Sequence, residues 1–446
     1  MTDPAGQAVP SHQFDPIGDL LGRIRLEFAD DHRGDVASYI PELSTADPEA
    51  FGLALVGVAG SRYEAGESGV PFTIQSVSKP FAYALALADV GMEAVLARVG
   101  VEPSGEGFNA ISLEPGTGRP DNPLINAGAI LTTSLVAGGG PEERFGRILD
   151  LLSRCAGREL PVDAAVYRSE RDTGDRNRAL AHLMRAAGSL SVPAEDAVDV
   201  YFRQCSVLVT AADLAVMAAT LANGGVHPLT GERVMDQLVA EQVLTVMATC
   251  GMYDYSGEWL LRVGLPAKSG VAGGLVAVSP SQFGIGLFSP PLDERGNSVR
   301  AVEASRAISE RFSLHLMHQV TRTGPSFVLV AEDGTEMSLP SPSGLGVVDV
   351  PVLSLQGYIE FASAEQAPLG LRRHVGDAVV PQGIVVDLDH VTQFHPVAVL
   401  LFDAIIGQLA RRGISVVTVD RQGRGMVASA GEFPRRAEAL AHLRGG

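Results

Sequence analysis

The chain contains two lysines, and each stands beside a serine at a spacing that suits nucleophilic catalysis. Ser76 and Lys79 form a Ser-x-x-Lys, and Lys268 opens the run Lys268-Ser-Gly270. All the other residues in the combined Lys and Arg count of 34 are arginines. An arginine stays protonated at any accessible pH, whereas a buried lysine can lose its proton and act as a base. The two lysines therefore predict an acyl-transfer enzyme.

The spacing of Ser76 and Lys79 places both side chains on one face of a helix that begins near Ser76. The free N–H groups and the positive dipole end at such a helix N-terminus suit an oxyanion. Pro80 and Phe81 could desolvate Lys79 and lower its pKa, so that it takes the serine proton. A lone Ser-x-x-Lys is more often a surface coincidence, but the scarcity of lysine argues against coincidence here.

The segments around these motifs predict a mixed α/β domain over residues 15–322. Apolar patterning predicts a strand at 52–60, a second at 70–74 that leads into Ser76, and a helix from Ser76 to Gly91. A helical insert follows at about 95–225, with its clearest helices at 142–155, 193–205 and 211–222. Strands are then predicted at 259–263, 273–278 and 282–288, and a long helix at 300–318. This order indicates an α/β layer interrupted by a mainly helical subdomain.

The composition changes after this domain. Residues 323–345 are rich in Gly, Pro, Ser and Thr and predict a linker, with one short strand candidate at 326–331. Residues 346–446 alternate between strand and helix patterns and predict a small α/β domain. Its predicted strands are 350–355, 383–388 and 415–420, and its predicted helices are 363–374, 396–411 and 434–443. The polar residues 1–14 are expected to be a disordered tail.

Composition excludes several classes of function. The formal net charge of −18 repels phosphate backbones and anionic membrane surfaces, so neither nucleic acid nor a membrane is an expected partner. No apolar run reaches the roughly 20 residues of a membrane span, and the N-terminus lacks a signal-peptide pattern. The three separated cysteines indicate a reduced, cytoplasmic protein. The histidines form no cluster with ligand spacing, so no metal or cofactor is predicted.

Taken in order, the two motifs resemble those of serine β-lactamases and penicillin-binding proteins, although a Ser-Asp-Asn motif is missing from the insert. A more specific resemblance, to the serine-dependent glutaminases, extends from about residue 35 to 319. It is carried by five strings: Phe72-Thr-Ile-Gln-Ser-Val-Ser-Lys-Pro80, Asn122-Pro-Leu-Ile-Asn-Ala-Gly128, Ser169-Glu-Arg-Asp-Thr-Gly-Asp-Arg-Asn177, Cys250-Gly-Met-Tyr-Asp-Tyr-Ser-Gly257 and Gly264-Leu-Pro-Ala-Lys-Ser-Gly-Val-Ala-Gly-Gly274. The resemblance implies a β-lactamase-like fold and hydrolysis of L-glutamine to L-glutamate and ammonia.

The resemblance also implies roles for individual residues. Ser76 would be the nucleophile, Lys79 would relay the proton, and Tyr253 would be the partner general base or acid. A nearby ammonium would favour the phenolate form of Tyr253. The main-chain N–H groups of Ser76 and Val271 would form the oxyanion hole. Without the resemblance, Tyr253 would be read as a half-buried tyrosine at a helix end. Lys268 could orient Tyr253, with a structural ion pair as the rival role.

A free amino acid must be held at its ammonium and at its carboxylate. The resemblance implies that Glu170 and Gln75 lie near the ammonium. Four neutral side chains would surround the carboxylate and the amide: Tyr39, Asn126, Asn177 and Tyr201. Ser76, Tyr253 and Val271 would also contact the substrate. Taken singly, each of them has an ordinary structural reading as a turn, surface or core residue.

The last hundred residues resemble a STAS domain, the fold of anti-sigma-factor antagonists, through the string that starts at Val352 and through Ile384-Val-Val-Asp-Leu-Asp-His-Val-Thr392. Switchable members carry Asp-Ser before the second helix, where this chain has His395-Pro396, so control by phosphorylation at that position is not expected. A protein or small-ligand partner, or self-association into a homo-oligomer, remains open for this domain. Two rivals to a glutaminase also remain: another serine acyl-transfer enzyme of the β-lactamase superfamily, and a non-enzymatic glutamine sensor.

Overall fold

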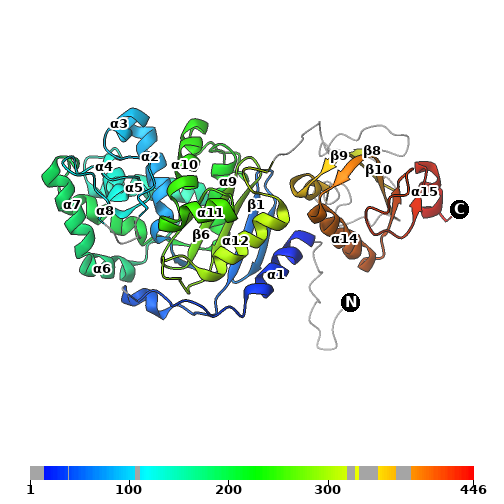
Figure 1. Ribbon diagram of the computed structural model, residues 1–446, viewed down its shortest axis with the longest axis horizontal. Coiled ribbons are helices and arrows are strands. Elements are labelled where there is room, and N and C mark those ends of the chain that lie inside the picture. Colours follow the sequence, from blue (N-terminus) through cyan, green and yellow to red (C-terminus); the bar gives the residue numbers. More distant parts are fainter. Residues whose placement is uncertain are drawn as a thin grey trace. The chain divides into compact units, whose positions relative to one another are not determined.

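The chain divides into two compact units (Figure 1). The computed structural model describes residues 15–38, 40–105, 111–318, 350–367 and 383–445, and the backbone of 327–330. The main unit comprises Leu21–Glu310 and Leu314–Met317, and the C-terminal unit comprises Met1–Leu20, Arg311–Ser313 and His318–Gly446. Ser76 and both lysines lie in the main unit. The predicted tail, residues 1–14, lies outside the described residues.

A five-stranded antiparallel sheet in the order β2-β1-β7-β6-β5 forms the centre of the main unit. Its strands are β1 (Gly52–Gly57), β2 (Arg62–Gly66), β5 (Ala267–Ser269), β6 (Gly274–Ser279) and β7 (Phe283–Phe288). Every residue of β1, β6 and β7 is buried, as expected for strands covered on both faces. Because β1 pairs with β7, the segments before and after the long helical region share one sheet, and β5 carries Lys268 at its edge.

Helix α9 (Ala211–Ala222) packs directly on this sheet, against β1, β6 and β7. Its close approach depends on two glycines of β7. A Cβ on Gly284 would lie 2.0 Å from the backbone nitrogen of Ala219, and one on Gly286 would lie 2.1 Å from the carbonyl oxygen of Ala211. Helix α9 therefore belongs to the sheet layer and not to the helical insert in which the sequence analysis placed it.

A two-stranded ladder connects the helical region to the segment before Ser76. Strand β3 (Phe72–Thr73) pairs with β4 (Leu208–Val209), and the Ile74 N–H donates to the Val207 carbonyl at 2.8 Å. The ladder thereby brings the end of α8 beside the start of α2. The remaining helices up to residue 312 are α1 (Pro16–Phe28), η1 (Pro41–Thr45), η2 (Gln75–Ser78), α2 (Lys79–Val90), α3 (Met92–Leu96), α4 (Asn126–Leu135), α5 (Pro141–Ala156), α6 (Ala164–Thr173), α7 (Asp175–Ala187), α8 (Ala194–Cys205), α10 (Gln237–Cys250), η3 (Tyr253–Tyr255), α11 (Ser256–Arg262) and α12 (Val299–Phe312).

The C-terminal unit is built on a second five-stranded sheet in the order β12-β11-β10-β9-β8. Its neighbours pair in parallel except β8 and β9, which are antiparallel. Buried valines of β9, β10 and β11 form its core with Ala439 and Leu440. The elements are β8 (Phe327–Val330), β9 (Val352–Ile359), β10 (Gly383–Phe394), α14 (Pro396–Arg411), β11 (Ser415–Val419), β12 (Glu432–Phe433) and α15 (Arg436–Leu443).

Several predicted elements are wrong. The segment 259–263, predicted as a strand, belongs to α11, which buries Trp259 completely and leaves Leu261 78% exposed. A short apolar run cannot be assigned from periodicity alone, and the Trp259 indole N–H finds its acceptor, the Leu265 carbonyl, only in the folded unit. The helix predicted to reach 318 ends at Phe312, because Ser313 has a φ of +54°.

Two differences concern the C-terminal unit. The predicted linker contains β8, which pairs with β9, so the second sheet begins before residue 346. Of the predicted helix at 363–374, residues 363–367 are helical and the rest lie outside the described residues. Among the helices that the structure describes, none is both long and apolar enough to cross a membrane.

Candidate active site

Ser76 and Lys79 are held by a tight helical turn. Ser76 lies in the 3₁₀ helix η2, and Lys79 is the first residue of α2. The expected α-helical first turn is therefore a 3₁₀ turn, in which positions three apart are eclipsed rather than merely on one face. Gln75 has a φ of +49°, a backbone conformation that a non-glycine residue adopts only where the surrounding structure enforces it. Strain thus immediately precedes a serine that is 8% exposed.

Lys79 is fully buried at the centre of the site. Its Nζ donates to Asn126 Oδ1 at 2.7 Å and to the Leu124 carbonyl at 3.3 Å. Burial lowers its pKa to about 8, although the acidic groups of Cys205 and Glu170 oppose this shift. No carboxylate among the described residues forms an ion pair with Lys79. About a tenth of the amine is therefore neutral at pH 7, the form that a proton acceptor must have, and this fraction grows as the pH rises.

Tyr253 opens η3 and also has a positive φ, +56°. Its hydroxyl lies 3.4 Å from the Ser269 carbonyl oxygen. Burial raises the pKa of Tyr253 to about 12, while hydrogen bonding with the Ser76 and Ser269 side chains acts in the opposite direction. The expectation that a nearby ammonium favours the phenolate is therefore wrong: burial dominates, and the phenol stays protonated at neutral pH.

Lys268 packs on Tyr253, with its Nζ 3.9 Å from the centre of the phenol ring. The same Nζ donates to the Ser269 carbonyl at 2.8 Å. Burial, with repulsion from Lys79, holds the pKa of Lys268 well below its usual value. Among the described residues no carboxylate is paired with Lys268. This geometry fits an orienting role toward Tyr253 better than the rival structural ion pair.

The turn after β5 brings the second predicted oxyanion donor toward Ser76. Gly273 donates its N–H to the Gly270 carbonyl at 2.9 Å, which closes a turn with Val271 at its second position. A Cβ on Gly270 would lie 3.4 Å from the Ser76 nitrogen, so the two backbones are in contact there. Val271 also lines a cleft of about 640 Å³, whose wall includes residues 33–38. Tyr39, the next residue, lies outside the described residues.

Asn126 connects Lys79 with two other predicted substrate-binding residues. Its Oδ1 accepts from Lys79 and, at 3.3 Å, from the Tyr201 hydroxyl. Its Nδ2 donates to Asn177 Oδ1 at 3.1 Å. Asn126 is the first residue of α4, Asn177 lies on α7 and Tyr201 on α8. Three helices of the insert thus place one polar side chain each beside Lys79.

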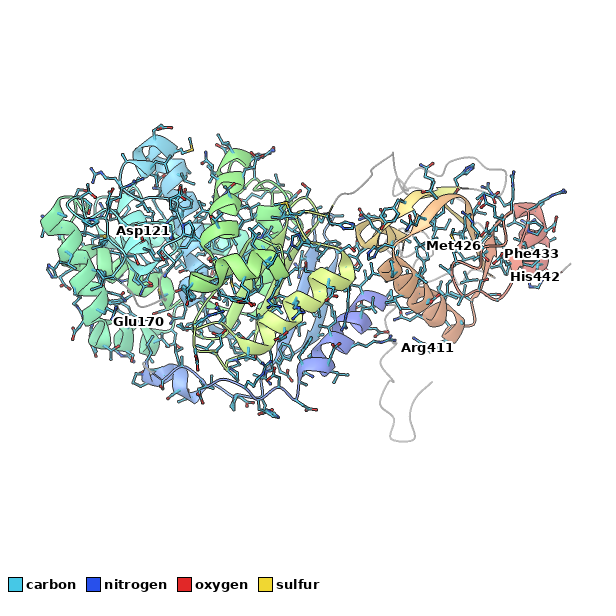
Figure 2. The ribbon with its side chains drawn as sticks, in the orientation of Figure 1. Asp121, Glu170, Arg411, Met426, Phe433 and His442 are labelled. Carbon is cyan, nitrogen blue, oxygen red and sulfur yellow. The ribbon has the colours of Figure 1, made fainter. Side chains whose placement is uncertain are left out.

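Glu170 is a buried carboxylate on α6 (Figure 2), only 7% exposed. Burial raises its pKa to about 7, although a hydrogen bond from Gln75 and the charge of Lys79 oppose the shift. No cation among the described residues forms an ion pair with it. Gln75 Nε2 also contacts Thr73 Oγ1 at 3.3 Å, which holds that amide in place. A buried carboxylate without a cationic partner is costly, and a bound ammonium would remove the cost.

Two residues near the site were not among the sequence predictions. Cys205, predicted as a buried hydrophobe, ends α8 close enough to Glu170 and Lys79 for their charges to act on its thiol. Asn297 accepts a hydrogen bond from Ser269 Oγ at 2.6 Å. Neither residue has a local sequence signal, because Asn297 lies 28 residues from Ser269 and Cys205 lies in an ordinary amphipathic helix.

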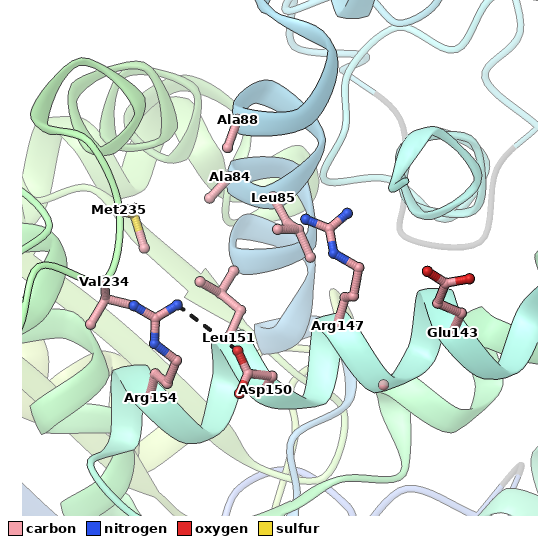
Figure 3. Close-up of a pocket in the computed structure, with 11 residues that line it drawn as sticks. Ala84, Leu85, Ala88, Glu143, Arg147, Asp150, Leu151, Arg154, Val234 and Met235 are labelled. Carbon is pink, nitrogen blue, oxygen red and sulfur yellow. Dashed lines mark ion pairs between the residues drawn. The ribbon is translucent and has the colours of Figure 1, made fainter. Parts of the chain in front are cut away.

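A second cavity, of about 430 Å³, lies between α2 and α5 (Figure 3). Apolar side chains such as Leu85 and Leu151 face it, and arginines line its rim. Those arginines already have partners: Arg147 binds Asp89 at 2.5 Å, and Arg154 binds Glu232 at 2.7 Å. The rim charges are thus neutralised within the protein, and we assign no ligand to this cavity.

The fold places the protein among proteins with a β-lactamase-like fold, and the buried serine and lysine three residues apart fit that class. Sequence comparison narrows this class: the family described as Glutaminase matches residues 34–317. A glutaminase of Trichormus variabilis is 49% identical over 320 residues, which cover 72% of this chain and 96% of that protein. A glutaminase of Corynebacterium efficiens is 44% identical over 407 residues, 91% of this chain and 92% of that protein. The chain belongs to the glutaminase family.

Solved structures agree with this assignment. The crystal structure of Mglu in its glutamate form is 41% identical, with a TM-score of 0.67, and the match covers 91% of this chain and 98% of that one. The predicted fold class and the prediction of an amide-hydrolysing enzyme are therefore confirmed. The roles of individual residues and the STAS-like character of the C-terminal unit stay predictions.

Proposed function

We propose that this protein hydrolyses L-glutamine to L-glutamate and ammonia through an acyl-enzyme on Ser76. The observation that carries the proposal is a set of three groups around the turn that holds Ser76. Lys79 is buried three residues after Ser76, and the protonated phenol of Tyr253 is hydrogen-bonded to Ser76. The buried carboxylate of Glu170 accepts from Gln75 and forms no ion pair with a described cation. The lysine can accept a proton, the phenol can donate one, and the carboxylate can bind an ammonium. Mglu, the related structure, is known in a glutamate form, which supports the same chemical class of ligand here.

In the acylation step, Ser76 Oγ attacks the side-chain amide carbon of glutamine while Lys79, in its neutral form, takes the serine proton. The carbonyl oxygen becomes an oxyanion that the N–H groups of Ser76 and Val271 stabilise. Two such donors commonly contribute about 3 kcal/mol each in a dry site. Tyr253 then gives its phenolic proton to the amide nitrogen, the C–N bond breaks, and ammonia leaves. The Lys79 ammonium returns a proton to Tyr253.

In the deacylation step, water attacks the glutamyl ester through the same oxyanion hole, and glutamate leaves as Ser76 regains its proton. Glu170 and Gln75 would hold the substrate ammonium throughout. The carboxylate and amide would lie among Tyr39, Asn126, Asn177 and Tyr201. A neutral set of donors suits this task, since Lys79 must stay uncharged to act as a base.

The substitution Ser76→Ala tests the mechanism directly. We expect ammonia release to fall by at least ~10⁴-fold, because no covalent intermediate can form. Glutamine should still bind, since the groups proposed to hold its ammonium and carboxylate are untouched; isothermal titration calorimetry measures this. Turnover that persists in the variant would exclude the Ser76 acyl-enzyme.

The same assay separates the rival functions. Glutamine, asparagine and a penicillin are offered in parallel while glutamate, aspartate and covalent acylation are followed. A β-lactamase or D-Ala-D-Ala peptidase would be acylated by the penicillin, and a glutamine sensor would bind glutamine without releasing ammonia. We expect neither result.

We further propose that the C-terminal unit is a STAS-like regulatory or docking module, that the protein forms a homo-oligomer, and that it works in the cytoplasm. Three free buried cysteines suit a reducing compartment. Size-exclusion chromatography with light scattering, on the full chain and on a chain that ends before β8, measures whether this module contributes to assembly.

A further inference from the structure

Asn297 stands at one end of a chain of polar groups whose other end is Ser76. Ser269 Oγ donates to Asn297 Oδ1 at 2.6 Å, and Ser269 also accepts from Tyr253, whose hydroxyl lies 3.4 Å from the Ser269 carbonyl oxygen. Tyr253 in turn shares a hydrogen bond with the Ser76 side chain. Asn297 and Ser269 are completely buried, so water does not enter this arrangement from the Asn297 side.

The backbone around Asn297 holds its side chain rigidly. The Asn297 N–H donates to Asp293 Oδ1 at 2.8 Å, and the Asp293 N–H donates to the Asn297 carbonyl at 2.8 Å. These bonds close a short turn between β7 and α12. The Asn297 Nδ2 group, by contrast, is buried without a hydrogen-bond partner among the described residues. Among the described residues, the hydrogen bonding of this side chain is therefore made by its Oδ1 atom alone, which accepts from Ser269.

The direction of a hydrogen-bond chain depends on where each hydroxyl sends its single proton. With an acceptor at Asn297, Ser269 sends its proton there and offers Tyr253 only acceptor atoms. Tyr253 then directs its own proton toward Ser269, and the lone pairs of Ser76 Oγ stay free for attack. Without that acceptor, the Ser269 hydroxyl can turn and donate to Tyr253. The phenol proton would then be directed at Ser76 Oγ and occupy a lone pair of the nucleophile.

We propose that Asn297 is a positioning residue for the reaction: its amide oxygen takes the Ser269 proton and so orients the Tyr253 phenol away from the lone pairs of Ser76. The inference rests on the Ser76 mechanism proposed above. It assigns a role to a residue whose hydrogen bonds among the described residues are made to Ser269 and Asp293, and not to Ser76 or the proposed substrate groups. The neighbouring lysines do not supply this direction, because Lys268 donates to the Ser269 carbonyl and Lys79 donates to Asn126.

Two substitutions separate orientation from structure. Asn297→Leu keeps the branched shape and removes the acceptor. We expect its kcat to fall about tenfold with an unchanged KM, while its melting temperature holds or rises, because a buried unpaired N–H₂ is removed. Asn297→Asp keeps the acceptor but buries a charge. Its kcat should stay within about threefold of the wild type although its melting temperature falls.

Asn297→Leu should thus have the lower kcat and the higher melting temperature, and Asn297→Asp the higher kcat and the lower melting temperature. A merely structural role of Asn297 would lower kcat and the melting temperature together. Should Asn297→Leu not fold, Asn297→Ala removes the same acceptor without adding bulk. Ser305→Ala, which deletes a fully buried α12 hydroxyl bonded to the Ala301 carbonyl at 2.7 Å, is the matched control and should leave kcat unchanged.

A kcat for Asn297→Leu within twofold of the wild type, or an equal loss in the Asp and Leu variants, would overturn the inference. Failure of the Ser76 mechanism is a separate result, because it shows as turnover by Ser76→Ala. If Ser76→Ala is inactive and Asn297→Leu is not slowed, the role of Asn297 alone is rejected.

Discussion

The two units each contain a buried carboxylate, one that forms an ion pair and one that does not. In the C-terminal unit, Asp420 is 3% exposed and is held by Arg424, whose Nε lies 3.0 Å away. Burial alone would raise the pKa of Asp420, but Arg424 and two backbone N–H groups lower it below its usual value. Glu170 in the main unit is nearly as buried, yet no cation among the described residues forms an ion pair with it, and its pKa rises to about 7.

The difference distinguishes a structural charge from a functional one. Asp420 follows β11, and its partner Arg424 also donates to the Leu388 and Val391 carbonyls of β10, so the pair joins the end of β11 to β10. Among the described residues, Glu170 forms no ion pair that joins two elements in this way. Keeping a carboxylate buried and unpaired lowers stability, and such a group persists where a ligand supplies the missing partner. Lys79, which is buried and forms no ion pair with a described carboxylate, is a functional charge by the same criterion.

After Ser76→Ala, the largest expected effect is at Lys79. Lys79→Arg should lower kcat/KM by at least ~10³-fold, because a guanidinium keeps its proton and cannot accept one from Ser76. Steady-state assays coupled to glutamate detection measure this. The single tryptophan, Trp259, is completely buried in the main unit, so its fluorescence verifies that the variant is folded. A rate near that of the wild type would remove Lys79 from the chemistry.

Glu170→Gln should act on binding. We expect KM for glutamine to rise by about 10²-fold, because a charge-assisted bond to the substrate ammonium is lost, with a smaller change in kcat. Asp172→Asn is the matched control, since Asp172 lies on the same helix with its side chain 67% exposed. An unchanged KM in Glu170→Gln would place the ammonium elsewhere.

Glu170 and Asp420 should have opposite effects on the free energy of unfolding. A raised folded-state pKa means that Glu170 stabilises the fold only in its protonated form, a contribution lost as the pH rises through about 7. Glu170→Gln should therefore raise the free energy of unfolding at pH 8 by ~1–3 kcal/mol, and the gain should shrink toward pH 5. Denaturant titration followed by Trp259 fluorescence reports this for the main unit.

Asp420 has a lowered pKa, so its contribution is complete at neutral pH and is lost only in acid. Asp420→Asn should destabilise the C-terminal unit by ~1–3 kcal/mol at pH 7, since Arg424 loses its charged partner. Hydrogen exchange of β10 and β11 measures this, with Glu438→Gln, in an exposed pair, as control. If Glu170→Gln and Asp420→Asn changed the free energy of unfolding in the same direction, Glu170 would not differ from Asp420 as a functional charge differs from a structural one.

The pH dependence of activity gives the smallest expected effect. Lys79, with a pKa of about 8, must be neutral, and Glu170, with a pKa of about 7, must be ionised. Both conditions are met increasingly as the pH rises, so kcat/KM should increase by about fivefold or more from pH 7 to 8, and more steeply below 7. In the variant Glu170→Gln, kcat/KM should no longer rise more steeply below pH 7, because that part of the profile comes from the ionisation of Glu170. A profile that falls over this range would contradict the assignments.

Local patterns in the sequence predicted much of the fold. The helix expected from Ser76 to Gly91 is observed as η2 and α2, and the helix expected at 396–411 is observed as α14 with His395 as its N-cap. These elements are long and periodic, and their ends carry recognisable signals. Helix α11 was misread because seven residues are too few to show a period, and α9 was misplaced because its packing depends on glycines more than 60 residues later.

By itself, the sequence determined the spacing of Ser76 and Lys79 and the family to which the chain belongs, because helix geometry and motif order are encoded in neighbouring residues. Only the tertiary structure decided the protonation of the site. Burial makes Lys79 a weaker base and Tyr253 a weaker acid, and the placement of Glu170 and Asn297 follows from segments far apart in the chain. Desolvation and pairing depend on which groups meet in space, and no local pattern records that.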